Sequence, residues 1–176
     1  MQAVIETERL RLEPFALSHL AGLRAMDDDP EIMRYINEGQ VKSEDETLAT
    51  IERVQQRWQR YGFSWWALRE KSSDDIVGAA CLQHLAHQEQ APLEIGWRLL
   101  RSSQGKGYAT EAATAIVQFA TGQIEVDYLV AVAHPENLAS HRVMQRLGMR
   151  YRGIEQHYDQ PCVVYELDMK SAPAHS

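Results

Sequence analysis

The segment Gln104-Gly105-Lys106-Gly107-Tyr108-Ala109 constrains the fold most, because it joins an alternating, strand-like run to an apolar helical run. The glycines at positions 105 and 107 have no Cβ, so the backbone there can approach a ligand closely. The unpaired N–H groups of the first helical turn favour anions at the same place. The spacing therefore predicts a diphosphate-binding turn between a strand and a helix.

Hydrophobic periodicity, interrupted at glycine and proline, predicts the other elements. The expected order is a strand, three helices, three strands, a helix, a strand, a helix and two closing strands, which makes an α/β (α+β) mixed sheet. The unit from residue 93 to 133 predicts a right-handed parallel crossover. The strands are expected at residues 9–12, 64–70, 76–84, 93–100, 128–133, 149–155 and 163–169, and the helices at residues 17–26, 31–35, 43–61, 107–121 and 137–147.

Length and composition predict one domain over residues 1–170, followed by a flexible tail at 171–176. The 176 residues are 44% hydrophobic and 24% charged, close to the averages for soluble globular proteins. No apolar run approaches the ~18 residues of a membrane span, and the N-terminus lacks a signal-peptide pattern. Cys81 and Cys162 show no CxxC spacing and are interpreted as structural thiols in a reducing cytosol. We therefore expect a cytoplasmic protein with no membrane partner.

The net charge of −7 argues against nucleic acid as a partner. Two segments, 98–106 and 137–154, carry only positive charges, whereas acids gather in two other places. This distribution predicts an anionic cofactor and a cationic acceptor, with two ordinary solvated faces as the alternative. The basic residues are Arg98, Arg101, Lys106, Arg142, Arg146, Arg150 and Arg152, and the acids are Asp27, Asp28, Asp29, Glu31, Glu38, Glu44, Asp45 and Glu46.

Two common phosphate-binding motifs fit the glycine turn poorly. A nucleotide P-loop requires Lys-Ser or Lys-Thr after its second glycine, and Gly107 is followed by Tyr108. The dinucleotide motif G-x-G-x-x-G has Thr110 in place of its third glycine, and it belongs in an N-terminal βαβ unit. A dinucleotide oxidoreductase is therefore a weak alternative.

Gln104-x-x-Gly107-x-Ala109 resembles the acyl-coenzyme A signature of the GNAT superfamily of N-acetyltransferases. The likeness extends to Glu94-Ile95-Gly96-Trp97 before the turn, and to residues 134–140 after the next strand. The segments at 137–149 and 7–12 resemble the branch typified by the ribosomal-protein N-terminal acetyltransferases, so the likeness covers nearly the whole chain. It implies a mostly antiparallel central sheet of about seven strands, flanked by helices, whose central strands splay apart.

The resemblance implies acetyl-CoA as co-substrate, with no metal. The pyrophosphate would bind the main-chain N–H groups of the glycine turn, with charge added by Lys106. The pantetheine arm would lie beside the strand before the turn and would meet Asn137 on its other side. The expected cofactor-binding residues are Ile95, Gly96, Trp97, Gln104, Gly105, Lys106, Gly107, Tyr108, Ala109 and Asn137.

Amine acetylation needs a deprotonated amine, an oxyanion donor and a proton for the leaving thiolate. Glu94 is the candidate base, with a cap or an ion pair to Arg98 as its alternative. A backbone N–H near residues 95–97 is the expected oxyanion donor, by resemblance. Ser140 is the candidate acid because it lies one helical turn after Asn137, and Tyr108 is the alternative.

The acceptor pocket is expected to be bordered by Met33, Tyr35 and Tyr158. His157 is interpreted either as a further border residue or as loop surface. His134 is interpreted either as a proton relay or as a loop residue packed near the cofactor.

The predicted function is direct transfer of an acetyl group from acetyl-CoA to a primary amine, either a protein N-terminal α-amine or a small cationic amine. The alternative is a non-catalytic module that senses acyl-CoA. Dimers are common in the resembling family, so a homodimer is among the expected assemblies.

Overall fold

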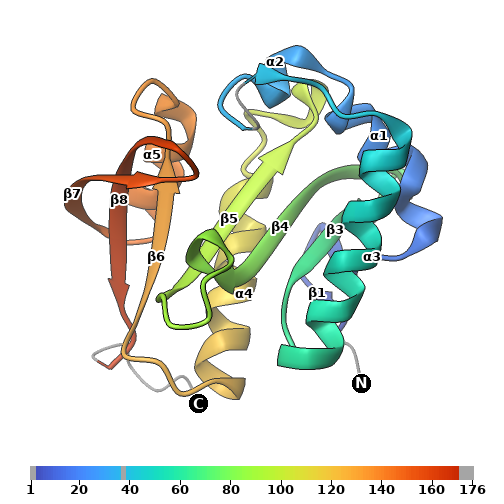
Figure 1. The fold of residues 1–176 in the computed structure, drawn as a ribbon. Helices are drawn as coiled ribbons and strands as arrows, with labels where there is room; N and C mark the ends of the chain where they lie inside the picture. The colour runs from blue at the N-terminus through green and yellow to red at the C-terminus, as the bar shows by residue number, and fades with distance from the viewer. Residues whose placement is uncertain (1–2, 37–38, 171–176) are drawn as a thin grey trace.

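Figure 1 shows the fold in a computed structural model that describes residues 3–36 and 39–170. In this part of the chain, eight strands form one sheet in the order β1-β2-β3-β4-β5-β6-β8-β7. Neighbouring strands pair antiparallel except β5 and β6, which are parallel. This confirms the predicted mixed, mostly antiparallel sheet flanked by helices. The additional strand, β1 (Ile5–Glu6), has two residues and is too short to produce an alternating pattern.

The first half of the chain forms one edge of the sheet and the helices that cover one of its faces. β2 (Leu10–Pro14) is followed by a short 3-10 helix, η1 (Leu17–His19), and by α1 (Leu20–Asp27), α2 (Pro30–Met33) and α3 (Glu44–Tyr61). The predicted capping box begins α3, because the Ser43 side chain accepts from the Glu46 N–H and the Glu46 carboxylate accepts in return. Gly62, with φ of 78°, ends the helix.

The second half contains the predicted strand–helix–strand unit. The elements in order are β3 (Trp65–Glu70), β4 (Ile76–His84), η3 (Leu85–His87), β5 (Leu93–Leu99), η4 (Arg101–Ser103), α4 (Tyr108–Gln123), β6 (Tyr128–Ala133), α5 (Leu138–Arg146), β7 (Arg150–His157) and β8 (Gln160–Asp168).

The last hairpin is tighter than predicted. The sequence predicts a loop from residue 156 to 161, but β7 and β8 are joined through Tyr158 and Asp159 alone. Both residues have positive φ, as a two-residue hairpin turn requires. The strand ends were not predicted, because the polar residues on either side of the turn do not alternate with apolar ones.

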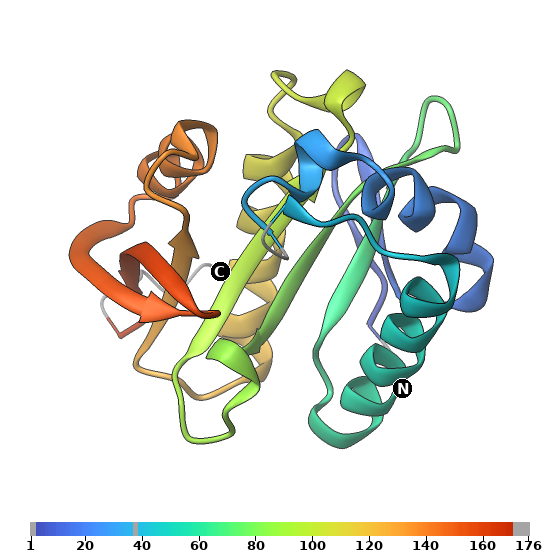
Figure 2. The same ribbon diagram turned by 45° about the horizontal axis from the view of Figure 1, so that its top comes forward.

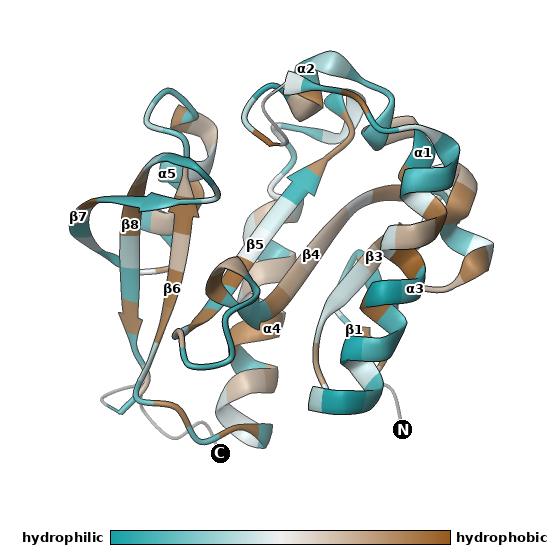
Figure 3. Cartoon of the chain, in the orientation of Figure 1, coloured by the Kyte–Doolittle hydropathy of each residue, from teal (hydrophilic) through white to brown (hydrophobic). Residues whose placement is uncertain are grey.

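The helices form a layer on each face of the sheet (Figures 1 and 2). α4 packs against β4 and β5 next to α5, while α1 and α3 lie on the opposite face. Figure 3 shows that β4 and β6 are largely hydrophobic and that the outer surface of α3 is hydrophilic. The core is continuous across both layers, and its fully buried members include Leu12, Leu23, Trp66, Leu82, Ile95, Ile116 and Leu129.

The strands β5 and β6 diverge along their length, which determines where a ligand can enter. They pair only where Leu93 lies opposite Leu129 and Glu94 opposite Val130. Beyond Glu94, β5 stays paired with β4 and β6 stays paired with β8, so the sheet opens into a V (Figure 1). The predicted splayed central strands are therefore present.

Residues 171–176, predicted as a tail, and Glu38 lie outside the described residues. None of the described helices combines the length and the apolar character that a membrane crossing needs.

Candidate active site

A cavity of about 630 Å³ lies at the open end of the V. Its volume falls within the range of ~300–1,000 Å³ that is common for small-molecule sites. Four regions line it: residues 31–36, the end of β5, the turn from Gln104 to Thr110, and the loop and first turns of α5. The V thus brings together segments that are far apart in sequence, as a site for a long ligand requires.

The glycine turn forms the anion-binding wall of this cavity. Gly105 and Gly107 have φ of 77° and 83°, and Gly107 is the N-cap of α4 without any side-chain cap. The first N–H groups of α4 are therefore available to an anionic ligand. Thr110 lies in the same wall, and its Oγ1 is buried with no hydrogen-bond partner among the described residues. An orphaned buried hydroxyl beside free helical N–H groups fits a phosphate group.

Arg9, which precedes β2, holds the glycine turn in place from outside the cavity. Its Nη1 donates to the Lys106 carbonyl oxygen at 2.8 Å, and its guanidinium lies 4.4 Å from the centre of the Tyr108 ring. Its Nε donates to Glu111 at 2.7 Å, and Glu111 also accepts from Thr7. The N-terminal segment therefore fixes the backbone that binds the ligand.

Two predicted residues of this turn have side chains with other roles. The Tyr108 hydroxyl donates to Glu70, so its proton is held on the side of β3. This hydrogen bond, and beyond it the charge of Lys106, holds the pKa of Glu70 below its usual value. Lys106 is not among the residues that line the cavity, whereas Gln104 and Ala109 are.

Two arginines of α5 supply positive charge on the opposite wall. Arg142 and Arg146 line the cavity, and neither has an ion pair within the described part of the chain. These are two of the basic residues that the charge pattern associated with an anionic cofactor.

Asn137 and Ser140 meet at the start of α5, as predicted. The Asn137 side-chain oxygen accepts from the Ser140 N–H at 3.3 Å and caps the helix. With the oxygen engaged, the Asn137 amide NH₂ is the group left to donate to a ligand. Both residues line the cavity, so Ser140 lies where a ligand in the V would pass.

The other wall is the free edge of β5. Because β6 has left this edge beyond Glu94, the main chain of residues 95–97 has no partner strand there. Trp97 lines the cavity, while Ile95 is buried and Gly96 is partly exposed. A Cβ at Gly96 would lie 3.1 Å from Cys81 Sγ, which is a tight contact, so the absence of a side chain at Gly96 leaves room for Cys81. An extended amide-bearing arm could pair here as an added strand.

Glu94 lies where β5 and β6 part and is only 6% exposed. Its Oε1 accepts from the Tyr158 hydroxyl and from Gln83 Nε2 at 3.3 Å. Burial raises the pKa of Glu94 to about 7, and the two hydrogen bonds only partly oppose this rise. Among the described residues none donates to Oε2, so this oxygen is left to take a proton.

The alternative reading of Glu94 as an ion-pair partner of Arg98 is wrong. Arg98 Nη1 instead contacts Asp27 at 2.6 Å, and its side chain is 10% exposed. Burial would raise the pKa of Asp27, but the Arg98 charge and a hydrogen bond from Thr47 outweigh it, and the pKa lies below its usual value.

Two of the acids near α2 therefore have structural roles. Asp27 is 1% exposed, while Asp29 caps α2 and pairs with Arg101 at 2.8 Å. These two residues do not form the acceptor-binding surface that the charge pattern predicted. Sequence could not show this, because their arginine partners lie more than seventy positions away.

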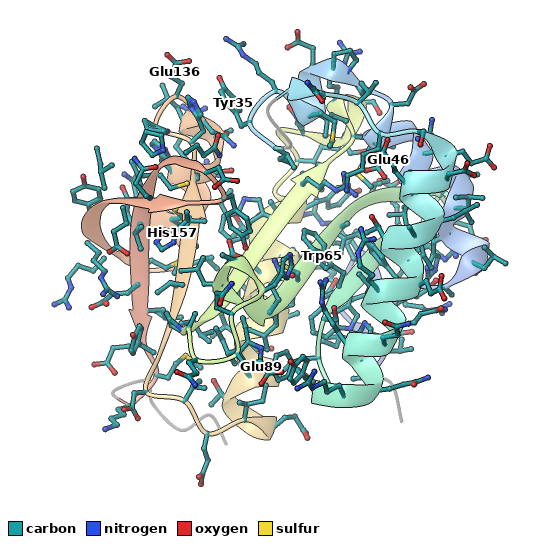
Figure 4. The ribbon with its side chains drawn as sticks, in the orientation of Figure 1. Tyr35, Glu46, Trp65, Glu89, Glu136 and His157 are labelled. Atoms are coloured by element: carbon teal, nitrogen blue, oxygen red, sulfur yellow. The ribbon has the colours of Figure 1, made fainter. Side chains whose placement is uncertain are left out.

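The three predicted acceptor-pocket residues are separated by the structure. Tyr35 lines the large cavity, and the centre of its ring lies 4.8 Å from that of His134, with the two rings tilted by 33°. Tyr158 contacts Glu94 from the hairpin turn. Met33 is fully buried, and its sulfur accepts from Arg98 Nη1 at 3.7 Å. His157 bonds Glu155 beside the hairpin (Figure 4).

Gln83 and Thr110 were missed by the sequence reasoning. Gln83 lies opposite Glu94 across the β4–β5 ladder, and this partnership depends on strand register. Thr110 could have been noticed as the hydroxyl residue in the first turn after the glycines. No cluster of metal-ligating side chains occurs within residues 3–36 and 39–170, and both cysteines are buried as free thiols.

Comparisons with known proteins identify the family of this chain. Residues 9–150 match the family described as Acetyltransferase (GNAT) domain. The uncharacterized N-acetyltransferase YnaD of Bacillus subtilis (strain 168) is 29% identical over 153 residues, covering 85% of this chain and 84% of its own.

Solved structures show the same fold. A GNAT-family acetyltransferase from Bacillus anthracis superposes with a TM-score of 0.80 at 24% identity, covering 96% of this chain and 100% of its own. RimL, a ribosomal L7/L12 alpha-N-protein acetyltransferase solved in complex with coenzyme A, gives a TM-score of 0.80 at 17% identity over 97% and 100% of the two chains. With the family match covering most of its length, this chain belongs to the GNAT family and is an acetyl-CoA-dependent acyltransferase.

Proposed function

We propose that this protein transfers the acetyl group of acetyl-CoA to a primary amine of a protein N-terminus or a small molecule, with Glu94 as general base. The observation that carries the proposal is the buried Glu94 carboxylate at the point where β5 and β6 part, with its pKa raised to about 7. A base with a pKa near the working pH can accept a proton and still be ionised often enough to act.

The cavity has the groups that coenzyme A would need. The α4 N-terminus, the Thr110 hydroxyl, Arg142 and Arg146 suit its phosphates, whereas the free edge of β5 and the Asn137 amide suit the pantetheine amides. Bound in this way, acetyl-CoA supplies an acetyl thioester near the apex of the V. The main-chain amides of the β5 edge near residues 95–97 are the proposed oxyanion donors.

The transfer needs two proton movements at named atoms. As the amine nitrogen bonds to the acetyl carbon and the carbon–sulfur bond breaks, the amine proton passes to Glu94 Oε2. The Ser140 hydroxyl donates to the departing sulfur and regains a proton from solvent. An α-amino group, with a reference pKa of ~8, needs less help from Glu94 than a lysine amine near ~10.4.

The proposal covers two classes of acceptor. A small cationic amine was predicted from the acidic segments, but Asp27 and Asp29 are already paired with arginines. The α-amine of a protein N-terminus is supported by the RimL fold, though only as a likeness of fold.

The test follows thiol release from acetyl-CoA with a panel of amines and N-terminal peptides. We expect release with at least one acceptor, and a fall of about 10²–10⁴-fold in kcat for Glu94→Gln with unchanged acetyl-CoA affinity. Ser140→Ala should lower kcat in the same assay while acetyl-CoA affinity is unchanged. Acetyl-CoA binding without release on any acceptor would refute the proposal and favour a sensor of acyl-CoA.

A further inference from the structure

A second, smaller cavity of about 30 Å³ lies beside α3, and one of its lining residues, Gln83, donates a hydrogen bond to Glu94. It is lined by Arg57 and Tyr61 of α3, by Phe63 and Ser64, and by the end of β4 with η3. Its volume suits a group of a few atoms and not a whole acceptor, since one water molecule needs roughly 10–15 Å³ by this kind of measure.

Ser64 shows that the small cavity has an unmet hydrogen bond. The residue is 1% exposed, and its Oγ has no hydrogen-bond partner among the described residues. A buried hydroxyl without a partner is unfavourable, and it points to a polar group that completes the site. An empty cavity left by imperfect packing is lined by apolar groups and needs no hydrogen-bond partner, unlike this one.

Gln83 connects the small cavity to the proposed base. Trp65 Nε1 donates to Gln83 Oε1 at 3.1 Å, which directs Gln83 Nε2 toward Glu94 at 3.3 Å. Trp65 lies on the sheet face toward α3 in Figure 4. A molecule held at this cavity would therefore extend toward Glu94 along Gln83.

The charge of the small cavity is positive. Arg57 is partly buried, and no described residue forms an ion pair or a hydrogen bond with its guanidinium. Burial and the neighbouring charge of Arg53 lower the pKa of Arg57, which shows that its positive charge is poorly compensated.

Glu89, the acid that contacts the lining residue Tyr61, is already paired with an arginine. Glu89 pairs with Arg60 and accepts from the Tyr61 hydroxyl. His87 lines the cavity too, and burial together with the Arg57 and Arg53 charges lowers its pKa. None of the described residues that line the small cavity is acidic, and the unpaired guanidinium and the Ser64 hydroxyl are the donors that an anion would use.

We propose that the acceptor is an amine that also carries an anionic group, a carboxylate or a phosphoryl group, and that Arg57 and Ser64 bind this group while the nitrogen reaches Glu94. This inference rests on the proposed acetyltransferase function and specifies its substrate class. It reverses the charge expected from the acidic segments of the sequence.

The experiment compares matched acceptors. The anionic set is glycine, β-alanine, γ-aminobutyrate, the corresponding aminoalkylphosphonates, and a Ser-Glu dipeptide amide. The controls are the carboxamides of the three amino acids, a Ser-Gln dipeptide amide, and putrescine as a dication. Thiol release gives kcat and KM for each acceptor.

We expect at least one anionic acceptor to exceed its neutral partner by about tenfold or more in kcat/KM, because a charge-assisted hydrogen bond is lost in the neutral compound. Arg57→Gln should raise KM for that acceptor about tenfold to a hundredfold, with kcat and the neutral acceptors unchanged. Arg60→Gln, on the same helix but paired with Glu89, is the matched control and should change neither value.

Equal kcat/KM for anionic and neutral partners, or an equal effect of Arg57→Gln on both, would overturn the inference while leaving the acetyltransferase intact. No release with any amine would instead count against the proposed function itself. Should Arg57→Gln fail to fold, inhibition of the wild-type protein decides: N-acetyl-γ-aminobutyrate should inhibit more strongly than its carboxamide, and equal inhibition would refute the site.

Discussion

Glu94 makes the stability of the fold depend on pH. Its pKa is about 7 in the folded protein, against about 4.3 for an unperturbed Glu. The folded state therefore keeps the proton over a pH range in which the unfolded state has lost it. Stability from this group is complete below about pH 4.3, falls as the pH rises, and levels off above about pH 7, with a difference of about 4 kcal/mol as an upper bound.

Glu94→Gln should remove this dependence, because Gln stays neutral at every pH and can still accept from Tyr158 and Gln83. Thermal melts at pH 5 and pH 8 measure it: the variant should gain several degrees of Tm relative to wild type at pH 8 and little at pH 5. Glu52→Gln, an exposed carboxylate on α3, is the control. Parallel pH curves for wild type and Glu94→Gln would contradict the raised pKa.

Thr110 should affect binding and stability in different directions. Its Oγ1 is buried without a partner, so Thr110→Val removes an unsatisfied group and leaves the stability of the free protein unchanged or slightly higher. If the hydroxyl donates to a phosphate, the same change weakens acetyl-CoA binding by about tenfold. Calorimetry and thermal melts on one sample give both values. Thr121→Val, at an exposed position of α4, is the control, and unchanged affinity in Thr110→Val would exclude the contact.

At the scale of elements, the N-terminal segment acts on the glycine turn through one side chain. Arg9 connects the Lys106 carbonyl, the Tyr108 ring and Glu111 of α4. Because these contacts fix the backbone without touching the cavity, we expect Arg9→Met to raise the Kd for acetyl-CoA several-fold. The partly exposed ion pair should contribute about 1 kcal/mol or less, which is a loss of a few degrees in Tm.

The matched control for that prediction is Arg11→Met, since Arg11 pairs with Glu6 in an exposed position remote from the turn. Isothermal calorimetry measures the Kd for acetyl-CoA in both variants, and we expect it to rise in Arg9→Met and to stay unchanged in Arg11→Met. A Kd that changes equally in both would assign the effect to general loosening of β2, and not to support of the turn.

An element could be predicted from the sequence when residues close to it in the chain determine it. The capping box at Ser43 and the glycine turn at 105–107 were recognised, because neighbouring residues determine them. The two-residue strand β1 was not predicted, because it forms only by pairing with β2. The tight turn at Tyr158 was not predicted either, because the pairing of β7 with β8 on both sides of it determines where it lies.

The site was predictable in part for the same reason. Motif spacing pointed to Glu94, Asn137 and Ser140; the first lies where β5 and β6 part, the other two line the large cavity, and their catalytic and binding roles stay predictions. The partners of Glu94, however, come from β4 and from the last hairpin, and the partners of the acids near α2 come from the end of β5 and the loop after it. Such contacts depend on the register and packing of distant segments, which charge patterns along the chain do not contain.

At the scale of the whole molecule, the sheet consists of two parts that are joined by only a short stretch of strand pairing. β1 to β5 form one part and β6 to β8 the other, and they pair only near Leu93 and Glu94 at the base of the V. The rest of the free β5 edge faces the large cavity, where its N–H groups have no strand partner. A ligand that fills the V would therefore connect the two parts as a missing strand would.

Hydrogen exchange tests this whole-molecule prediction. In the free protein, amides on the open edge of β5 beyond Glu94, in the Gln104–Thr110 turn and at the start of α5 should exchange by local opening. Acetyl-CoA should slow these amides selectively, while amides of β2, β3 and β4 that open locally keep their rates. Equal slowing throughout the sheet would mean that the ligand only adds global stability, RT ln(1 + [L]/Kd), without bridging the V. The Thr110→Val and Arg9→Met variants, measured at matched saturation, should show the same protected region, because they change how tightly the ligand is held and not where it lies.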